Sequence, residues 1–309
     1  MAEYLGFGGV TVDLLGTIDG MPGWDETVYL DGFTVQQGGM AATAMVTVAR
    51  LGGSAEFVGA VGPDVFGVQT LGSFRDTGVD CGRVWTAPSG STPLSNVLVD
   101  RRTGRRTILH HRGVLEEPSL PGLDAGTLDL EGVRFLHMDG LLLDSAVELA
   151  ARARRRGIVV TLDLTGRLFE RPERTEELIG YADYLIPSRV WAERYTGEAD
   201  AFAAAEALLR SGARAVIVTM GGEGSAVVSE ERRFRVPAFE VPVVDTTGAG
   251  DVFHGGLLYG LGLGLDLERA VVLASAVAAL KCTEPGGQAG IPDLEAVRRF
   301  LARRGRNVL

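Results

Sequence analysis

Residues 243–256 read VVDTTGAGDVFHGG, and the small residues between the two aspartates are the most informative feature of the chain. Glycines let a backbone turn so tightly that several amide groups face one point. A helix that begins near Asp251 would add unpaired N–H groups and the positive end of its dipole. The stretch therefore predicts an anion site, and phosphate is the anion we expect.

Short apolar runs alternate with longer amphipathic ones around this stretch, which is typical of βαβ units and a parallel sheet. A strand that ends at Val244 would place the anion site at the carboxyl ends of the strands, where open α/β sheets bind ligands. We predict a three-layer α/β fold, with a mainly parallel central sheet flanked by helices. The expected strands lie within 3–13, 55–61, 133–139, 157–163, 182–187 and 213–220, and the expected helices within 40–52, 64–78, 144–157, 200–212, 266–281 and 293–305.

Two segments interrupt this alternation and predict a separate small sheet. Residues 96–111 have the pattern of a β-hairpin with a Thr-Gly turn, and residues 16–35 alternate polar and apolar side chains between Gly and Pro turns. Such hairpins cannot belong to a parallel βαβ series. We expect a single domain over residues 1–309, in which segments of about 14–36 and 92–112 form a small antiparallel β lid.

The composition narrows the class of partner. The 309 residues are 46% hydrophobic with a formal net charge of −10, and nucleic acid would require a basic surface instead. No run approaches the roughly 18 apolar residues of a membrane span, and the N-terminus lacks the pattern of a signal peptide. Cys81 and Cys282 are too few for a disulfide framework. We expect a cytoplasmic protein that binds a small molecule, with no nucleic-acid or membrane partner.

The chain contains a single lysine, Lys281, beside 29 arginines. A codon bias toward arginine explains most of this imbalance, and we favour that interpretation. The alternative is that Lys281 reaches a bound nucleotide from the end of its helix.

Asp251 has two candidate roles. Transfer of a phosphoryl group to an alcohol requires one group that accepts the hydroxyl proton and donors that hold the charge on the phosphate. Asp251 stands where it could accept that proton, but an aspartate at this position can also simply cap its helix. The chain has no GxxxxGK[ST] motif, so the predicted anion site is not a P-loop. The chemistry alone leaves both roles open.

Four stretches, in order, resemble the motifs of one family. VVDTTGAGDVFHGGLLYGL, from Val243, is similar to the C-terminal signature of the PfkB, or ribokinase-like, carbohydrate kinases, and it matches their DTxGAGD motif at every fixed position. FTVQQGGMAATAMVTVARLGG from Phe33 resembles the family's GG signature, GAVGPDVFG from Gly59 its GxxGxDxxG stretch, and VTMGGEGS from Val218 its TxGxxG turn. The resemblance extends over the whole chain.

The resemblance implies a role for each residue of the opening stretch. Asp251 would be the base that deprotonates the acceptor hydroxyl, and Gly248, Ala249 and Gly250 would form the anion hole for the transferred phosphoryl group. Asp245 matches a ligand of a monovalent cation, together with the carbonyl of Thr247. K⁺ is therefore a candidate cofactor beside ATP and Mg²⁺.

Further residues match the family's acceptor and nucleotide sites. On the acceptor side they are Asp13, Gly38, Gly39 and Thr43; carboxylate oxygens suit a vicinal diol, and glycines let a polyol lie against the backbone. On the nucleotide side they are Thr219, Gly221 and Gly224, with Gly287 in the adenine and cation loop CTEPGGQAGIP.

Two departures from the family pattern concern the acceptor and the metal. The family's usual asparagine is Thr43 here, so the acceptor need not be ribose. Many members carry an NxxE motif that helps to place Mg²⁺, whereas this chain has Ser188 and Trp191 at its fixed positions. We still expect Mg-ATP, because water and the nucleotide's own phosphates can hold Mg²⁺.

Within the family, the chain is most similar to the bacterial branch that includes 6-deoxy-6-sulfofructose kinase. Sulfofructose itself does not follow, because a sulfonate needs a cationic or amide-lined pocket and the loop 137–145 contains no arginine. The basic turn of the 96–111 hairpin could supply cations, although we favour a solvated turn there. A phosphorylated or acidic sugar remains open.

We predict an ATP-dependent phosphotransferase that acts on a hydroxyl of a small sugar, preferably a ketose or a related sugar. One alternative is a nucleoside kinase of the same family, for which Trp24, Tyr29 and Phe33 could provide an aromatic surface. The other is a non-catalytic sugar or nucleotide sensor, for which only Ser188 and Trp191 argue. We also expect a homodimer formed through the lid.

Overall fold

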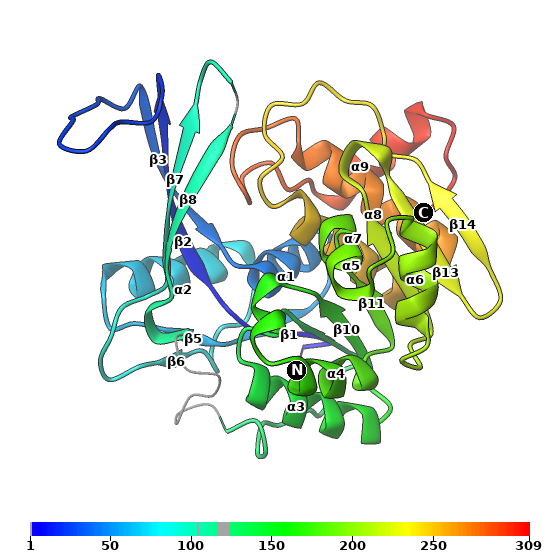
Figure 1. The fold of residues 1–309 in the computed structure, drawn as a ribbon. Helices are drawn as coiled ribbons and strands as arrows, with labels where there is room; N and C mark the ends of the chain where they lie inside the picture. Colours follow the sequence, from blue (N-terminus) through cyan, green and yellow to red (C-terminus); the bar gives the residue numbers. More distant parts are fainter. Residues whose placement is uncertain (1, 104, 116–123) are drawn as a thin grey trace.

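The central sheet has eight strands and confirms the predicted α/β fold (Figure 1). In this computed structural model, the described residues are 2–103, 105–115 and 124–309. The strands are β1 (Tyr4–Phe7), β4 (Ala55–Val58), β9 (Phe135–Met138), β10 (Val159–Asp163), β11 (Tyr184–Ile186), β12 (Ala215–Thr219), β13 (Ser225–Ser229) and β14 (Arg233–Val236). Their order is β14-β13-β12-β11-β10-β9-β1-β4, and only β13 and β14 run antiparallel to their neighbours.

The helices cover both faces of this sheet. They are α1 (Met40–Arg50), α2 (Val65–Thr77), α3 (Leu143–Arg155), α4 (Pro172–Tyr181), α5 (Arg189–Thr196), α6 (Ala201–Leu209), α7 (Ala249–Gly262), α8 (Leu267–Lys281) and α9 (Leu294–Arg303), with short 3-10 turns at Gly113–Leu115, Gly166–Glu170 and Gly221–Glu223. In the described part of the chain, none of them has the length and hydrophobicity that a membrane span requires.

The core is divided by the sheet into two layers, because successive strand residues point to opposite faces. Leu136 packs in one cluster with α3, α4, α5 and α6, whereas its neighbour Phe135 packs in another with α1, α7 and α8. Asp64, Asp200, Asp266 and Asp293 cap helices with their side chains, as predicted. The prediction for Asp144 is wrong: α3 begins one residue earlier, and Asp144 instead pairs with Arg171 and Arg174.

A four-stranded sheet stands to one side of this body and forms the predicted lid (Figure 1). It contains β2 (Thr11–Ile18), β3 (Gly32–Gly38), β7 (Leu94–Asp100) and β8 (Arg106–His111), in the order β3-β2-β7-β8. The two outer pairs are antiparallel, as expected for hairpins, and the central pair β2–β7 is parallel. A separate parallel pair joins β5 (Ala60–Val61) and β6 (Trp85–Thr86).

Two strand predictions are wrong. The single strand expected over 3–13 is divided at Gly8 and Gly9 into β1 and β2, which lie in different sheets. No strand ends at Val244 either: Val243 and Val244 lie in an irregular segment and are 62% and 61% exposed. An apolar run this short cannot distinguish a strand from an exposed connection.

Helix α7 packs closely on α1 through Gly255, which predicts a large effect of one added methyl group. A Cβ at Gly255 would lie 2.5 Å from the carbonyl oxygen of Ala44 and 2.5 Å from Cβ of Thr47. We expect Gly255→Ala to lower the free energy of unfolding by about 1–3 kcal/mol, the usual cost of overpacking. Thermal and denaturant unfolding would measure the change.

Gly72→Ala is the matched control. Gly72 lies within α2, and a Cβ there would meet nothing within 4 Å. Because alanine favours a helix over glycine by roughly 1 kcal/mol, this variant should be as stable as the parent or more so. Equal destabilisation of both variants would contradict the packing argument.

Candidate active site

Asp251 lies in the first turn of α7, directly after the small-residue loop. Gly248 is the N-cap and has a left-handed φ of 71°; a Cβ there would lie 2.8 Å from the carbonyl oxygen of Gly287. Ala249 and Gly250 open the helix, and the first amides of a helix have no acceptor inside it. The N–H of Ala249 already donates to the carbonyl of Thr246 at 3.2 Å. The loop therefore places a partly exposed carboxylate beside a helix N-terminus, the part of a helix that favours an anion.

Three other carboxylates surround Asp251. Burial, followed by the charges of Asp163, Asp139 and Asp13, raises its pKa to about 7 against the opposing charge of Lys281. Asp139 follows β9 and Asp163 ends β10, so the site does lie at the carboxyl ends of the strands. Burial also raises the pKa values of Asp139 and Asp163 to about 7.

Asp139 has no solvent exposure and joins three segments of the chain. Its carboxylate accepts hydrogen bonds from the backbone N–H groups of Gly9 at 2.9 Å, Leu141 at 3.0 Å and Ala41 at 3.4 Å. Gly9 belongs to the connection between β1 and the lid, and Ala41 to the first turn of α1. A Cβ at Gly8 would overlap this carboxylate, so the connection requires glycine there.

The predicted acceptor residues meet at the base of the lid. Asp13 lies in β2 between Gln36 of β3 and Ser95 of β7, and Ser95 pairs in turn with His110 of β8. A Cβ at Gly38 would lie 2.7 Å from Oδ2 of Asp13, so the carboxylate rests against the glycine backbone. Burial raises the pKa of Asp13, while Ser95 and the charge of His110 oppose that shift. The result is a polar row across one face of the lid.

The second glycine and Thr43 are held by the body of the protein. Gly39 is the N-cap of α1 with φ of 102°, and a Cβ there would overlap the carbonyl oxygen of Gly9. Thr43 is 1% exposed, and its hydroxyl oxygen accepts a hydrogen bond of 3.0 Å from Nε2 of Gln288. Thr43 thus connects α1 with the 282–292 loop, and its contact with an acceptor remains a prediction.

The predicted nucleotide residues line a cavity of about 390 Å³ that also reaches the anion loop. Gly224 has φ of 90°, and a Cβ there would overlap the carbonyl oxygen of Val236. Gly287 lies outside the cavity lining: its N–H donates to Oε1 of Gln36 at 2.7 Å, which ties the loop to the lid. The other lining residues include Thr219, Gly221, Ala249, Gly250, Phe253 and Cys282.

Asp245 uses both its carboxylate and its carbonyl inside the protein. The carboxylate accepts hydrogen bonds from the N–H groups of Thr247 at 2.8 Å and Gly286 at 2.7 Å, and the carbonyl oxygen accepts one of 2.9 Å from Nζ of Lys281. Burial would raise the pKa of Asp245, but these amides and the Lys281 charge hold it below its usual value. The oxygens of Asp245 are therefore engaged by the chain itself, and a role of the Thr247 carbonyl as a cation ligand stays a prediction.

The comparisons with known proteins agree with this geometry. Residues 1–294 match the model of the pfkB family carbohydrate kinases. The chain belongs to this family. PfkB carbohydrate kinases are phosphotransferases that act on sugar hydroxyls, and this chain is such an enzyme.

Curated relatives and solved structures place the chain among the ribokinase-like members. It is 28% identical to a deoxyribokinase of Salmonella typhi over 94% of this chain and 96% of that protein. It is also 28% identical to a ribokinase of Lactococcus lactis over 95% of both chains. The crystal structure of a ribokinase from Thermotoga maritima superposes with a TM-score of 0.82 at 27% identity, over 98% of this chain and 100% of that one.

Positions where this PfkB kinase departs from the family pattern have structural roles. Ser188 caps α5 by accepting a hydrogen bond from the N–H of Trp191. Trp191 is 5% exposed, stacks on Tyr195, and donates from its indole N–H to the carbonyl of Thr165. This corner presents an aromatic cluster in place of a carboxylate.

Sequence reasoning missed Asp139 and Asp163. Each directly follows or ends a buried apolar run, FLHM or VVTL, at the position where a parallel strand meets a ligand. His254, one turn after Asp251, lies beside these carboxylates: its Nδ1 is 3.9 Å from Oδ2 of Asp163. Burial lowers the pKa of His254 to about 3, so this imidazole is neutral.

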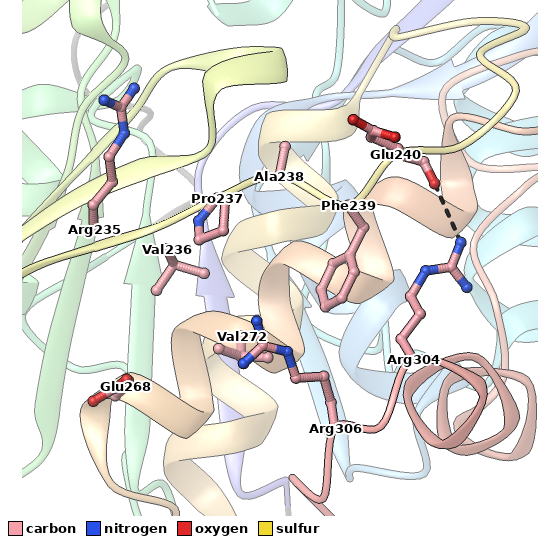
Figure 2. Close-up of a pocket in the computed structure, with 10 residues that line it drawn as sticks. All are labelled: Arg235, Val236, Pro237, Ala238, Phe239, Glu240, Glu268, Val272, Arg304 and Arg306. Carbon is pink, nitrogen blue, oxygen red and sulfur yellow. Dashed lines mark hydrogen bonds between the residues drawn. The ribbon is translucent and has the colours of Figure 1, made fainter.

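A second cavity, of about 510 Å³, shares Ala238 and Phe239 with the first (Figure 2). Three of its charged side chains have partners within the protein: Arg304 donates to the carbonyl of Glu240 at 3.2 Å, Arg235 pairs with Glu223, and Glu268 pairs with Arg232. This cavity does not include the loop that precedes α7. We therefore assign it no part in the reaction.

The raised pKa of Asp163 predicts a pH-dependent gain in stability from Asp163→Asn. A folded-state pKa of about 7 lies above the usual 3.8, so folding binds protons, and this contribution is lost as the pH rises through 7. At pH 8 we expect the variant to be more stable than the parent by about 1–3 kcal/mol, because one unfavourable buried charge is gone. Thermal unfolding between pH 5 and 8 should show the difference growing with pH.

Glu295→Gln on α9 serves as the control for this measurement. Its side chain is 63% exposed, so removing its charge should change stability little at any pH. A gain from Asp163→Asn that is the same at pH 5 and pH 8 would contradict a raised pKa at this position.

Proposed function

We propose that this chain transfers the γ-phosphoryl group of Mg-ATP to a hydroxyl of a small sugar, with Asp251 as the base. The observation that carries the proposal is the position of Asp251 at the start of α7. The charge of Asp13 acts on its pKa, and its neighbours Ala249 and Gly250 line the cavity of about 390 Å³. A hydroxyl held at Asp13 and a phosphoryl group held by the loop amides would then meet at this carboxylate.

The raised pKa of Asp251 suits proton abstraction from an alcohol. A base is most effective when its pKa lies near the working pH, because it is then both charged and strongly basic. The nearby carboxylates of Asp163 and Asp139 supply part of that shift. The N–H groups of Gly248–Gly250 and the positive end of α7 would stabilise negative charge on the transferred group.

Mg²⁺ fits this site as part of the bound nucleotide. Within the described residues, no group of three His, Cys, Asp or Glu side chains is arranged to hold a metal ion. Mg²⁺ commonly keeps several waters and binds through substrate phosphates. It would neutralise charge on the phosphates, while the chain's own residues position the acceptor and remove its proton.

The substrate we favour is a ketose or a related small sugar. Trp24 and Tyr29, which could stack on a nucleobase, are 98% and 89% exposed and cover nothing in this conformation. That favours a sugar over a nucleoside. The lid arginines Arg101 and Arg112 pair with carboxylates, Arg101 with Asp19 and Asp31 and Arg112 with Glu170, which favours the solvated turn over a sulfonate pocket.

We further propose a homodimer formed through the lid sheet. Phe33 and Val35 of β3 and Ile108 and Leu109 of β8 are 38–58% exposed, an unusual density of apolar side chains on two edge strands. Burying such a surface against a second copy would stabilise both lids.

The first test is ADP formation from Mg-ATP across ketoses, aldoses, sugar acids, phosphosugars and nucleosides, with Asp251→Asn beside the parent. We expect turnover with one class of sugar and a loss of about 10²–10⁴-fold in the variant, which retains shape but not the base. Glu295→Gln is the control and should leave turnover unchanged. Tight acceptor binding without acceptor-dependent ADP would favour the sensor instead.

The pH dependence of kcat/KM provides a second test of the base. Asp251 must be charged to accept a proton, so kcat/KM should fall as the pH drops below about 7. Asp163→Asn should move this acid limb to lower pH, because the Asp163 charge raises the pKa of Asp251. An acid limb that stays in place in Asp163→Asn would argue against this electrostatic coupling.

A further inference from the structure

The single lysine of the chain is completely buried beside the anion loop. Lys281 ends α8, and its side chain has no solvent exposure. Among the described residues it is the only basic side chain in the buried class. The other 29 lysine or arginine positions of the chain are all arginine. The one lysine thus lies where a compact ammonium fits and a planar guanidinium would need more room.

The Lys281 ammonium is directed at the backbone of the anion loop. Its Nζ donates a hydrogen bond of 2.9 Å to the carbonyl oxygen of Asp245. Burial lowers the pKa of Lys281, and the charges of Asp245 and Asp251 oppose that shift. A buried charge needs partners of opposite sign, and these two carboxylates supply them.

Asp245 in turn connects the two loops that form the phosphate end of the site. Its carboxylate holds the N–H of Thr247 in the anion loop and the N–H of Gly286 in the 282–292 loop. The second loop packs on the first, because a Cβ at Gly248 would lie 2.8 Å from the carbonyl of Gly287. The ammonium at Asp245 therefore fixes the backbone on which the amides of Gly248–Gly250 depend.

These contacts leave little room for an exchangeable cation at the same carbonyl. Both carboxylate oxygens of Asp245 already accept N–H bonds, and its carbonyl oxygen already accepts from Lys281. A K⁺ ion at that carbonyl would stand within a few ångströms of the ammonium, and like charges at that range repel. Asp245 therefore does not fit the role of a monovalent-cation ligand that we expected for it.

We infer that the Lys281 ammonium is a built-in cation that takes the place of K⁺ at the Asp245 carbonyl, so that phosphoryl transfer does not depend on a monovalent cation. Only the second part of this inference, the effect of Lys281 on turnover, rests on the proposed function. Lys281 acts through Asp245 and the loop and is a positioning residue.

The first experiment needs no turnover, because one lysine gives one signal. In protein labelled only in its lysine side chain, the ¹⁵Nζ and ¹³Cε resonances report Lys281 alone. We expect the nitrogen shift of an ammonium that stays unchanged when K⁺ replaces tetramethylammonium in the buffer. A neutral amine, or a saturable shift on adding K⁺, would overturn the inference whatever the acceptor proves to be.

The second experiment measures turnover in salts of different cations. With the acceptor found by the ADP assay, kcat should agree within about twofold in K⁺, Na⁺ and tetramethylammonium, a difference small against a site-specific effect. Lys281→Met should lower kcat by about 10-fold to 100-fold, the range for groups that orient a ligand indirectly. Added K⁺ should restore part of the lost rate in Lys281→Ala, which has room for the ion.

The control is Arg303→Met, which removes an exposed basic side chain from the last turn of α9. It should retain full turnover and show no response to K⁺. A parent enzyme that is active only with K⁺, or a Lys281→Ala variant that folds but never responds to K⁺, would refute a role as a built-in cation. Absence of turnover with every acceptor and salt would instead refute the proposed function, and the resonance experiment would still decide the question of Lys281.

Discussion

The Asp139 carboxylate has no contact with solvent, and the arrangement of the site depends on it. It holds the N–H groups of Gly9, Ala41 and Leu141 at once, and so joins the end of the central sheet, the connection to the lid and the start of α1. A buried carboxylate is costly unless amides satisfy it, so these three backbone segments are fixed relative to one another. Gly38 and Gly39, which we predict to contact the acceptor, lie directly before α1. Their position is therefore fixed together with the start of that helix.

The burial of Asp139 also affects the pKa of Asp251. A carboxyl group near Asp139 and Asp163 cannot ionise as readily as one in water, because each added negative charge repels the others in a region poor in solvent. His254 and His137 add no compensating charge, because burial lowers the pKa of both imidazoles. Among the described residues, Lys281 is the one buried cation whose charge acts on Asp251. The fold thus supplies a basic carboxylate at the cost of some stability above neutral pH.

The sequence was sufficient to predict the fold class and the lid, whereas the roles of the individual site residues stay predictions. Those predictions depend on features that a few neighbouring residues determine. Asp64 and Asp266 cap helices, and Gly39 and Gly248 adopt a positive φ. The ends of parallel strands are where such folds bind ligands. The missing strand at Val244 and the division of 3–13 were not predictable in the same way. Whether these residues form a strand, and in which sheet, depends on the distant segment with which their backbone pairs. The pattern of apolar residues does not identify that segment.

The role of Lys281 was also hidden from the sequence, for a different reason. The sequence shows that Lys281 is the only lysine of the chain. It does not show whether that lysine faces solvent or a backbone carbonyl. Only the fold brings the end of α8 against Asp245, which is 36 positions away in the chain.

A hydrogen bond between Oε1 of Gln36 and the N–H of Gly287 joins the lid to the 282–292 loop. Gln36 lies opposite Asp13 in the lid sheet, and Gly287 packs on Gly248 at the N-cap of α7. An acceptor that draws the lid toward Asp251 must therefore move or strain a contact that supports the anion loop. Because Asp245 and Lys281 hold the loop to the body of the protein, we expect that strain to fall on the lid.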